Sequence, residues 1–316
     1  GTNVAVLNMM LYFIVESKLH KEDFILSRTE GFENFLKEIK KLDIDQLAKA
    51  AGVDKQQVKE AAIAYATAKN SMEFHGLGVT EHEQGSKTVM LIADLAMITG
   101  NIGRRGVGVN PLRGQNNVQG AADMGCQPHQ GAGYFPVADK KIQDFYTEKY
   151  GVVHPTKAGL KIPQIFDAAI NREVRAVWII GEDVVQTDPN SAHVAKAMNA
   201  LDLLVVQEIF MSETAKHADV VLPGTTFLEK DGTFTNTERR VQRVNKAAEP
   251  LPGTKPDGLI VTEMMQKLGY DQKLYDADEV LAEIADVVPF FKGINRERLG
   301  KLGLQWPVKE DGTDTK

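Results

Sequence analysis

Three short apolar runs in the second half of the chain constrain its fold more than any other feature. The runs at residues 176–180, 203–206 and 219–222 have the length and composition of buried strands. A helical pattern at 191–200 separates the first two runs, and a shorter helical segment at 214–215 separates the second and third. Strand–helix–strand units of this spacing imply parallel pairing with right-handed crossovers. The sequence therefore predicts an α/β protein built on a parallel sheet.

The segments that follow these strands are polar or rich in glycine. In open parallel sheets, ligands bind outside the carboxyl ends of the strands. Here those ends fall at residues 181–188, 207–211 and 223–226. The topology by itself therefore predicts a ligand site at this edge of the sheet.

A glycine-rich stretch covers residues 100–136 and lacks a helical or alternating apolar period long enough to form a regular element. A loop of this length inside a compact domain is uncommon and is usually functional or disordered. Its glycines allow the backbone to approach a ligand closely. A mobile surface loop is the alternative, but Val107, Leu112 and Met124 are residues of the buried type. We expect the stretch to be a long loop that lines the ligand site.

Composition narrows the functional classes. The 316 residues are 43% hydrophobic and 25% charged, which is ordinary for a globular protein of about two domains. A net charge of −6 provides no basic surface, so nucleic acid is not expected as a partner. The single cysteine excludes a disulfide framework and a self-contained four-cysteine metal or iron–sulfur site. No segment has the length and flanks of a membrane span or signal peptide, so no membrane segment is expected and the cytoplasm is the expected compartment.

The amino-terminal third is predicted to be mainly helical. Apolar residues recur at helical spacing over residues 4–14, and Asp54 is placed to cap a later helix. A short strand at 72–77 leads into a polar loop, and a strongly apolar helix follows at about 87–99.

The carboxyl-terminal third begins with a predicted strand pair over residues 231–246 that is rich in arginine. Arginines in such a pair commonly form a solvated edge, and the alternative is that they flank an anionic cofactor or a partner. Helices are expected to follow at about 258–268 and 278–287.

Arg113, in the glycine-rich stretch, has the most distinctive chemistry among the candidate side chains. Its guanidinium can bind a planar carboxylate through two parallel hydrogen bonds and does not lose its charge. A loop arginine in a salt bridge is the alternative. Cys126 and His129 have the spacing of half a metal site without further ligands, and no complete phosphate-binding motif is present. These residues predict a ligand site but do not name the ligand.

Several long motifs together resemble the catalytic subunit of molybdopterin-dependent formate dehydrogenases, which are built around a bis(molybdopterin guanine dinucleotide) molybdenum or tungsten centre. The motifs occur in the family's order and spacing, and the resemblance covers most of the chain, from residue 1 to about residue 269. They lie at residues 100–103, 109–120, 123–125, 181–183, 187–190, 206–210, 214–215, 218–223 and 229–242.

The resemblance implies Rossmann-like αβα cofactor-binding domains on parallel sheets, here incomplete. Residues 1–115 correspond to the second half of one molybdopterin-binding domain and residues 116–316 to a second, with 231–257 as a ribbon toward an iron–sulfur domain. In the family, a cysteine or selenocysteine followed by histidine binds the metal, and four cysteines near the amino terminus hold a [4Fe–4S] cluster. This sequence has neither. The resemblance therefore implies an internal fragment of a larger subunit that is inactive by itself.

The resemblance also implies roles for individual residues. Arg113 matches the family's active-site arginine, which orients the formate carboxylate beside the metal, and Gln115 matches a pterin contact. A pterin-binding turn is matched by Leu77, Gly78, Val79, Thr80 and Glu81. Positions around the second guanine dinucleotide are matched by Asp183, Thr187, Gln207, Glu208, Ile209, Gly224 and Asp257.

The implied reaction of the intact enzyme is the oxidation of formate to carbon dioxide, with electrons leaving through the cluster to electron-transfer subunits. Another oxidoreductase of the same cofactor family, such as a nitrate reductase, shares the motifs at the strand ends, although the run at residues 113–117 favours formate. The alternative outside the enzymes is a folded fragment that binds a partner or nothing.

Overall fold

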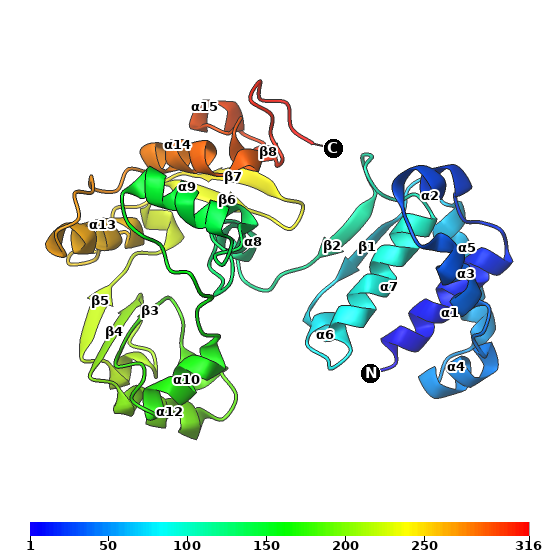
Figure 1. Cartoon of the computed structure of the whole chain (residues 1–316), viewed down its shortest axis with the longest axis horizontal. Helices are drawn as coiled ribbons and strands as arrows, with labels where there is room; N and C mark the ends of the chain where they lie inside the picture. The colour runs from blue at the N-terminus through cyan, green and yellow to red at the C-terminus, as the bar shows by residue number, and fades with distance from the viewer. Residues whose placement is uncertain (316) are drawn as a thin grey trace. The chain divides into compact units, whose positions relative to one another are not determined.

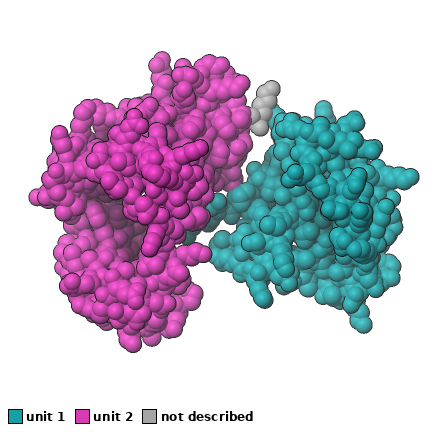
Figure 2. Space-filling view, in the orientation of Figure 1, with its two compact units in different colours: residues 1–118, 316 teal, residues 119–315 magenta. Residues whose placement is uncertain are grey.

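A computed structural model describes residues 1–315 of the chain. They divide into two compact units, residues 1–118 and residues 119–315, which are coloured separately in Figure 2. Each unit has hydrophobic core residues of its own and is described by itself. None of the helices formed by the described residues is long and apolar enough to cross a membrane.

Unit 1 is mainly helical and contains one two-stranded parallel sheet (Figure 1). Strand β1 pairs with β2 from Met72 opposite Gly108 to His75 opposite Pro111. Helix α7 packs against both strands, and α1 packs against α3, α4, α5 and α7. The elements of unit 1 are α1 (Asn3–Glu16), α2 (Glu22–Arg28), α3 (Phe32–Ile39), α4 (Ile44–Ala51), α5 (Lys55–Thr67), β1 (Met72–His75), α6 (Leu77–Thr80), α7 (Gly85–Ile98) and β2 (Gly108–Pro111).

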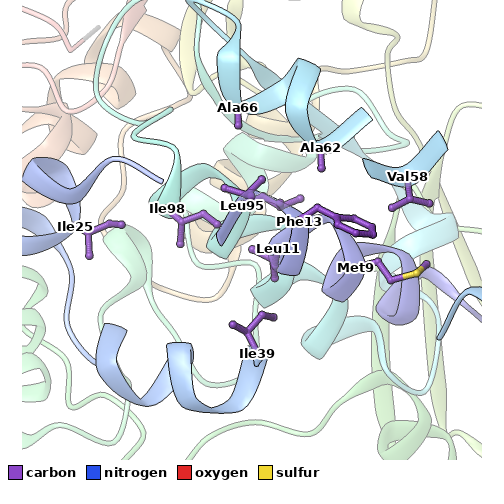
Figure 3. Packing of buried hydrophobic residues seen from close by; sticks show 11 residues of the cluster. Met9, Leu11, Phe13, Ile25, Ile39, Val58, Ala62, Ala66, Leu95 and Ile98 are labelled. Atoms are coloured by element: carbon purple, nitrogen blue, oxygen red, sulfur yellow. The ribbon is translucent and has the colours of Figure 1, made fainter. Parts of the chain in front are cut away.

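Helix α1 lies at the centre of the core of unit 1, and the helix expected there is confirmed. Figure 3 shows Leu11 of α1 clustered with Ile39 of α3 and Leu95 of α7. The caps also follow the local sequence, since the Asp54 carboxylate accepts hydrogen bonds from two backbone amides in the first turn of α5. Apolar periodicity and capping thus account for the helices of this unit.

Two segments of unit 1 differ from the prediction. Strand β2 lies inside residues 100–136, where no regular element was expected, and so does the short helix α8 (Val118–Asp123) of unit 2. A four-residue strand that is held by pairing to β1 needs no apolar period of its own, and a helix of six residues is too short to show one. The polar loop expected after β1 begins with the helical turn α6. A Cβ on Gly85 would lie 2.2 Å from the carbonyl oxygen of Thr80, so the absence of a side chain lets α7 begin directly against this turn.

Unit 2 contains the predicted parallel sheet, with strand order β3-β4-β5. The strands expected at 176–180, 203–206 and 219–222 and the helix at 191–200 are confirmed, within two residues at the ends. Helices α10 and α12 pack together against the side chains of β4 that alternate into the core. These elements are α10 (Ile162–Ile170), β3 (Ala176–Ile180), α11 (Val184–Thr187), α12 (Ser191–Ala200), β4 (Leu203–Glu208) and β5 (Val220–Pro223).

The remainder of unit 2 holds an antiparallel sheet of order β6-β7-β8. The predicted strand pair is confirmed, and β8 adds a third strand from the far end of the chain. Helices α13 and α14 confirm the two carboxyl-terminal helices. The elements are α8 (Val118–Asp123), α9 (Lys140–Tyr150), β6 (Gly232–Thr235), β7 (Arg240–Val244), α13 (Asp257–Lys267), α14 (Ala277–Val287), α15 (Arg296–Leu299) and β8 (Leu304–Gln305).

Candidate functional site

The carboxyl ends of β3, β4 and β5 lie side by side in unit 2. The backbone amide of Gly181 donates to the carbonyl of Gln207 across 2.9 Å, and that of Gly224 donates to the carbonyl of Glu208 across 3.1 Å. Parallel pairing continues to the last residues of each strand, so the polar segments that follow begin at one edge. This edge is where the topology predicts a ligand.

Asp183 joins two of these segments. Its Oδ1 accepts hydrogen bonds from the backbone amide of Thr214 at 2.8 Å and from its hydroxyl at 2.6 Å. Partial burial acts to raise the pKa of Asp183, but the hydrogen bonds from Thr214 and Glu213 lower it overall. An ionised Asp183 therefore holds the segment after β4 against the turn after β3, where Thr187 donates to Glu182 at 2.7 Å.

Gln207 and Asp257 form the most enclosed part of this edge. Gln207, the next-to-last residue of β4, is buried, and its Nε2 donates to Oδ1 of Asp257 at 2.7 Å. The other oxygen of Asp257 pairs with the ammonium of Lys230. A Cβ on Gly224 would lie 3.0 Å from Oδ1 of Asp257, so the lack of a side chain there leaves room for the carboxylate. Three other segments of unit 2 thus meet at the carboxylate of Asp257.

Two buried polar atoms at this edge have no hydrogen-bond partner within residues 1–315. They are Oε1 of Gln207 and Oγ1 of Thr225. Leaving such an atom unsatisfied costs about 1–3 kcal/mol, and natural folds rarely tolerate it without a use. Nearby, Ile209 and Phe210 expose large apolar side chains. The edge therefore combines buried, unsatisfied hydrogen-bonding atoms with exposed apolar side chains, two features that occur in sites for heterocyclic ligands.

A second group of candidates lies in unit 1, at the carboxyl ends of β1 and β2. The amide of Leu112 donates to the carbonyl of His75 at 2.6 Å, and a Cβ on Gly76 would lie 3.3 Å from the carbonyl oxygen of Leu112. The turn at residues 77–81 and the loop at 113–117 therefore start from the same edge of the small sheet.

Arg113 is exposed in that loop, and its guanidinium has neither a hydrogen bond nor an ion pair to any other described residue. The alternative of a salt-bridged loop arginine does not hold within residues 1–315. Gln115 is exposed two residues further on. An unpaired guanidinium beside an open turn keeps its full capacity to bind an anion.

Within residues 1–315, no three histidine, cysteine, aspartate or glutamate side chains are grouped so as to hold a metal ion. Cys126 is a free, exposed thiol.

The structure brings the predicted residues together as two sets, one in each unit. The set in unit 1 comprises Leu77, Gly78, Val79, Thr80, Glu81, Arg113 and Gln115. The set in unit 2 comprises Asp183, Thr187, Gln207, Glu208, Ile209, Gly224 and Asp257.

Sequence reasoning assigned no role to Thr214, Thr225 or Lys230, which contact the unit 2 set or lie beside it. Thr214 and Lys230 belong to motifs that match the family, so position in a motif was an available signal. No sequence pattern indicates Thr225, because this residue stands out only through its buried hydroxyl, which has no hydrogen-bond partner within residues 1–315. These three residues are added to the candidate site.

Comparison with known proteins shows extensive similarity to one family. The molybdopterin oxidoreductase family model matches residues 1–267. The F420-dependent formate dehydrogenase subunit alpha of Methanocaldococcus jannaschii is 43% identical over 315 residues, which cover 98% of this chain and 46% of that protein. Formate dehydrogenase H of Escherichia coli is 40% identical over 312 residues, covering 98% of this chain and 44% of that protein. The chain thus spans less than half the length of these relatives.

The fold has a counterpart among solved structures. The acetylene hydratase of Pelobacter acetylenicus superposes with a TM-score of 0.70 over 94% of this chain and 43% of that chain, at 19% sequence identity. At this identity the likeness concerns the fold alone.

Proposed function

Because the chain belongs to the molybdopterin oxidoreductase family, we propose that it is part of the catalytic subunit of a formate dehydrogenase. The proposed reaction is the oxidation of formate to carbon dioxide at a bis(molybdopterin guanine dinucleotide) centre holding molybdenum or tungsten. Two relatives named as formate dehydrogenases, each over 98% of this chain, support this substrate. The observation that carries the proposal is the unpaired, exposed guanidinium of Arg113 beside the turn at 77–81.

The residues of unit 2 fit a guanine dinucleotide. The free Oε1 of Gln207 and the free hydroxyl of Thr225 offer hydrogen bonds that no described residue satisfies, and the carboxylates of Asp183 and Asp257 can accept from guanine N–H groups. Residues 77–81 and Gln115 are proposed to hold the pterin part. When bound, the cofactor's metal centre supplies the acceptor for the two electrons of formate oxidation.

Arg113 has the chemistry to orient formate. Two parallel N–H donors of the guanidinium match the two oxygens of the carboxylate, so the bound anion has a fixed plane and its C–H bond points away from the arginine. Oxidation converts HCOO⁻ into CO₂, one proton and two electrons. The arginine takes no proton in this step, because it remains charged throughout, and its contribution is positional and electrostatic.

The partners and compartment belong to the same proposal. Electrons would leave through a [4Fe–4S] cluster, held by cysteines that are not among these 316 residues, to electron-transfer subunits. The ribbon at 231–257 is proposed to face the iron–sulfur domain. A single cysteine fits the reducing cytoplasm.

The test is Arg113→Lys in the full-length subunit, with Arg105→Lys as the matched control at an exposed loop position. We expect Arg113→Lys to reduce formate turnover about 100-fold or more while metal content is unchanged, since lysine keeps the charge but not the fork. The control is expected to retain wild-type turnover. Formate turnover near wild type in Arg113→Lys would remove Arg113 from the mechanism.

A further inference from the structure

Lys230 occupies an unusual position for a lysine. It lies between β5 and β6, and its ammonium pairs with Oδ2 of Asp257 and also donates to the carbonyl of Thr225 at 3.3 Å. Its side chain is 27% exposed and that of Asp257 is 36% exposed. By contrast, Lys246 pairs with Glu249, whose side chain is 85% exposed. An ion pair shielded in this way is screened less by water and salt than a surface pair.

The contacts of Lys230 complete the fixation of the Asp257 carboxylate. Gln207 donates to Oδ1 at 2.7 Å and Lys230 pairs with Oδ2, so each oxygen is held by a different segment. A carboxylate has about four acceptor positions, and these two partners use two of them. The carboxylate therefore keeps free acceptor positions on both oxygens while its plane is set from two sides.

We propose that Lys230 is a positioning residue for Asp257, which fixes this carboxylate to recognise the Watson–Crick edge of guanine. The inference rests on the proposed function, because that function places a guanine nucleotide at this edge. Guanine presents two neighbouring donors, N1–H and the 2-amino group, and a carboxylate of fixed plane can accept from both. A base without the 2-amino group offers one of these donors fewer. Lys230 thus acts on affinity and on base selectivity through Asp257.

The role also explains why a cation is needed here. Asp183, Glu182 and Glu208 lie at the same strand ends, so the edge is rich in carboxylates. Removing the Asp257 carboxylate partly from water, close to other carboxylates, costs free energy. The positive charge of Lys230 offsets this cost, whereas a neutral residue would not.

The experiment measures binding of GDP and IDP to the purified 316-residue chain by titration calorimetry, for the wild type, Lys230→Met, Lys230→Arg and the control Lys246→Met. We expect the wild type and Lys246→Met to prefer GDP over IDP. Lys230→Met should lose about tenfold in affinity for GDP and most of the preference for GDP. Lys230→Arg should retain the affinity and the preference, because it keeps the positive charge beside Asp257. Circular dichroism checks folding, and Lys230→Gln replaces Lys230→Met if the latter unfolds.

The possible outcomes distinguish a failure of the proposed guanine site from a failure of the proposed role of Lys230. A wild-type chain that binds neither nucleotide contradicts the proposed guanine site and, with it, this inference. A wild-type chain that prefers GDP, together with a folded Lys230→Met or Lys230→Gln variant of equal affinity and preference, leaves the proposed site intact and overturns the role of Lys230. An equal loss of affinity for GDP and IDP in the Lys230 variant would also overturn this role. A residue that positions Asp257 for guanine must change the affinity for GDP more than the affinity for IDP, because only guanine carries the 2-amino group.

Discussion

The hydroxyl of Tyr65 donates a hydrogen bond to Oε1 of Glu73, while Oε2 of the same carboxylate is buried without a partner among residues 1–315. Glu73 lies on β1, two residues before the strand ends beside the pterin-binding turn proposed above. Burial raises the pKa of Glu73 to about 7, even though the hydrogen bond from Tyr65 opposes the shift. A carboxylate in this setting makes the stability of unit 1 depend on pH.

The sign of that dependence follows from the raised pKa. Between about pH 4.5 and 7 the unfolded chain has lost the proton of Glu73 but the folded chain keeps it, so the free energy of unfolding falls as pH rises. For the wild type, this fall in the free energy of unfolding amounts to up to about 3 kcal/mol. We expect Glu73→Gln to abolish the fall, because glutamine does not titrate, and therefore to stabilise the chain at pH 8. Urea unfolding at pH 4.5, 6 and 8 measures the free energy of unfolding, with Glu33→Gln, a substitution at an exposed position, as the control. Parallel pH profiles for the wild type and Glu73→Gln would contradict the prediction.

The fully buried carboxylate of Asp123 should be essential for stability in unit 2. Its Oδ1 accepts from Tyr134 at 2.7 Å and from Gln119 at 2.9 Å, and its Oδ2 accepts from the indole of Trp306 at 2.9 Å. Asp123→Ala leaves three donors without this acceptor, and we expect a loss of about 3–5 kcal/mol.

Thermal unfolding of Asp123→Ala measures this loss. In a Trp178→Phe background, the emission of Trp306 should also shift, because that residue is then the sole tryptophan. Substitution of the exposed Asp271 by alanine is the control and should change neither signal. A stability loss below about 1 kcal/mol would mean that the network is replaceable.

The core around α1 should be sensitive to the loss of volume. Leu11 is fully buried in the cluster of Figure 3, so Leu11→Ala should destabilise the chain by about 2–5 kcal/mol through lost burial and a residual cavity. Leu26, which is 75% exposed, provides the matched Leu26→Ala control, with an expected change within about 0.5 kcal/mol. The change in stability is measured from the midpoint of denaturant unfolding, provided that the m-value of each variant equals that of the wild type. Equal effects of the two substitutions would show that α1 is not central to the core.

The isolated chain should not oxidise formate. The sequence has no cysteine followed directly by histidine, the pair that the resemblance to the family places at the metal, so the purified chain is expected to hold no stoichiometric molybdenum or tungsten and to reduce no dye with formate. Elemental analysis and a formate–dye assay measure both quantities. If both were positive, the metal ligands would have to lie within this chain.

Much of the fold follows from local sequence. The run at 176–180 is apolar throughout and the helix at 191–200 has an apolar face, so each element was predictable from its own residues, and the crossover rule then required parallel pairing. The same rule marked the strand ends that include Gln207 and Gly224. Strand β2 was missed because its four residues are ordered by β1, more than thirty residues earlier in the chain.

The sequence by itself therefore determined the class of fold, the family and the edge at which a ligand is expected, because these depend on local patterns and on motifs in order. Only the tertiary structure decided how the site is assembled. The hydrogen bond from Gln207 to Asp257 joins residues fifty positions apart, and the pairing of Lys230 with Asp257 depends on the packing of a later helix start. Burial left atoms of Gln207 and Thr225 without partners. Such properties arise from which segments are brought together in space, and no local pattern records them.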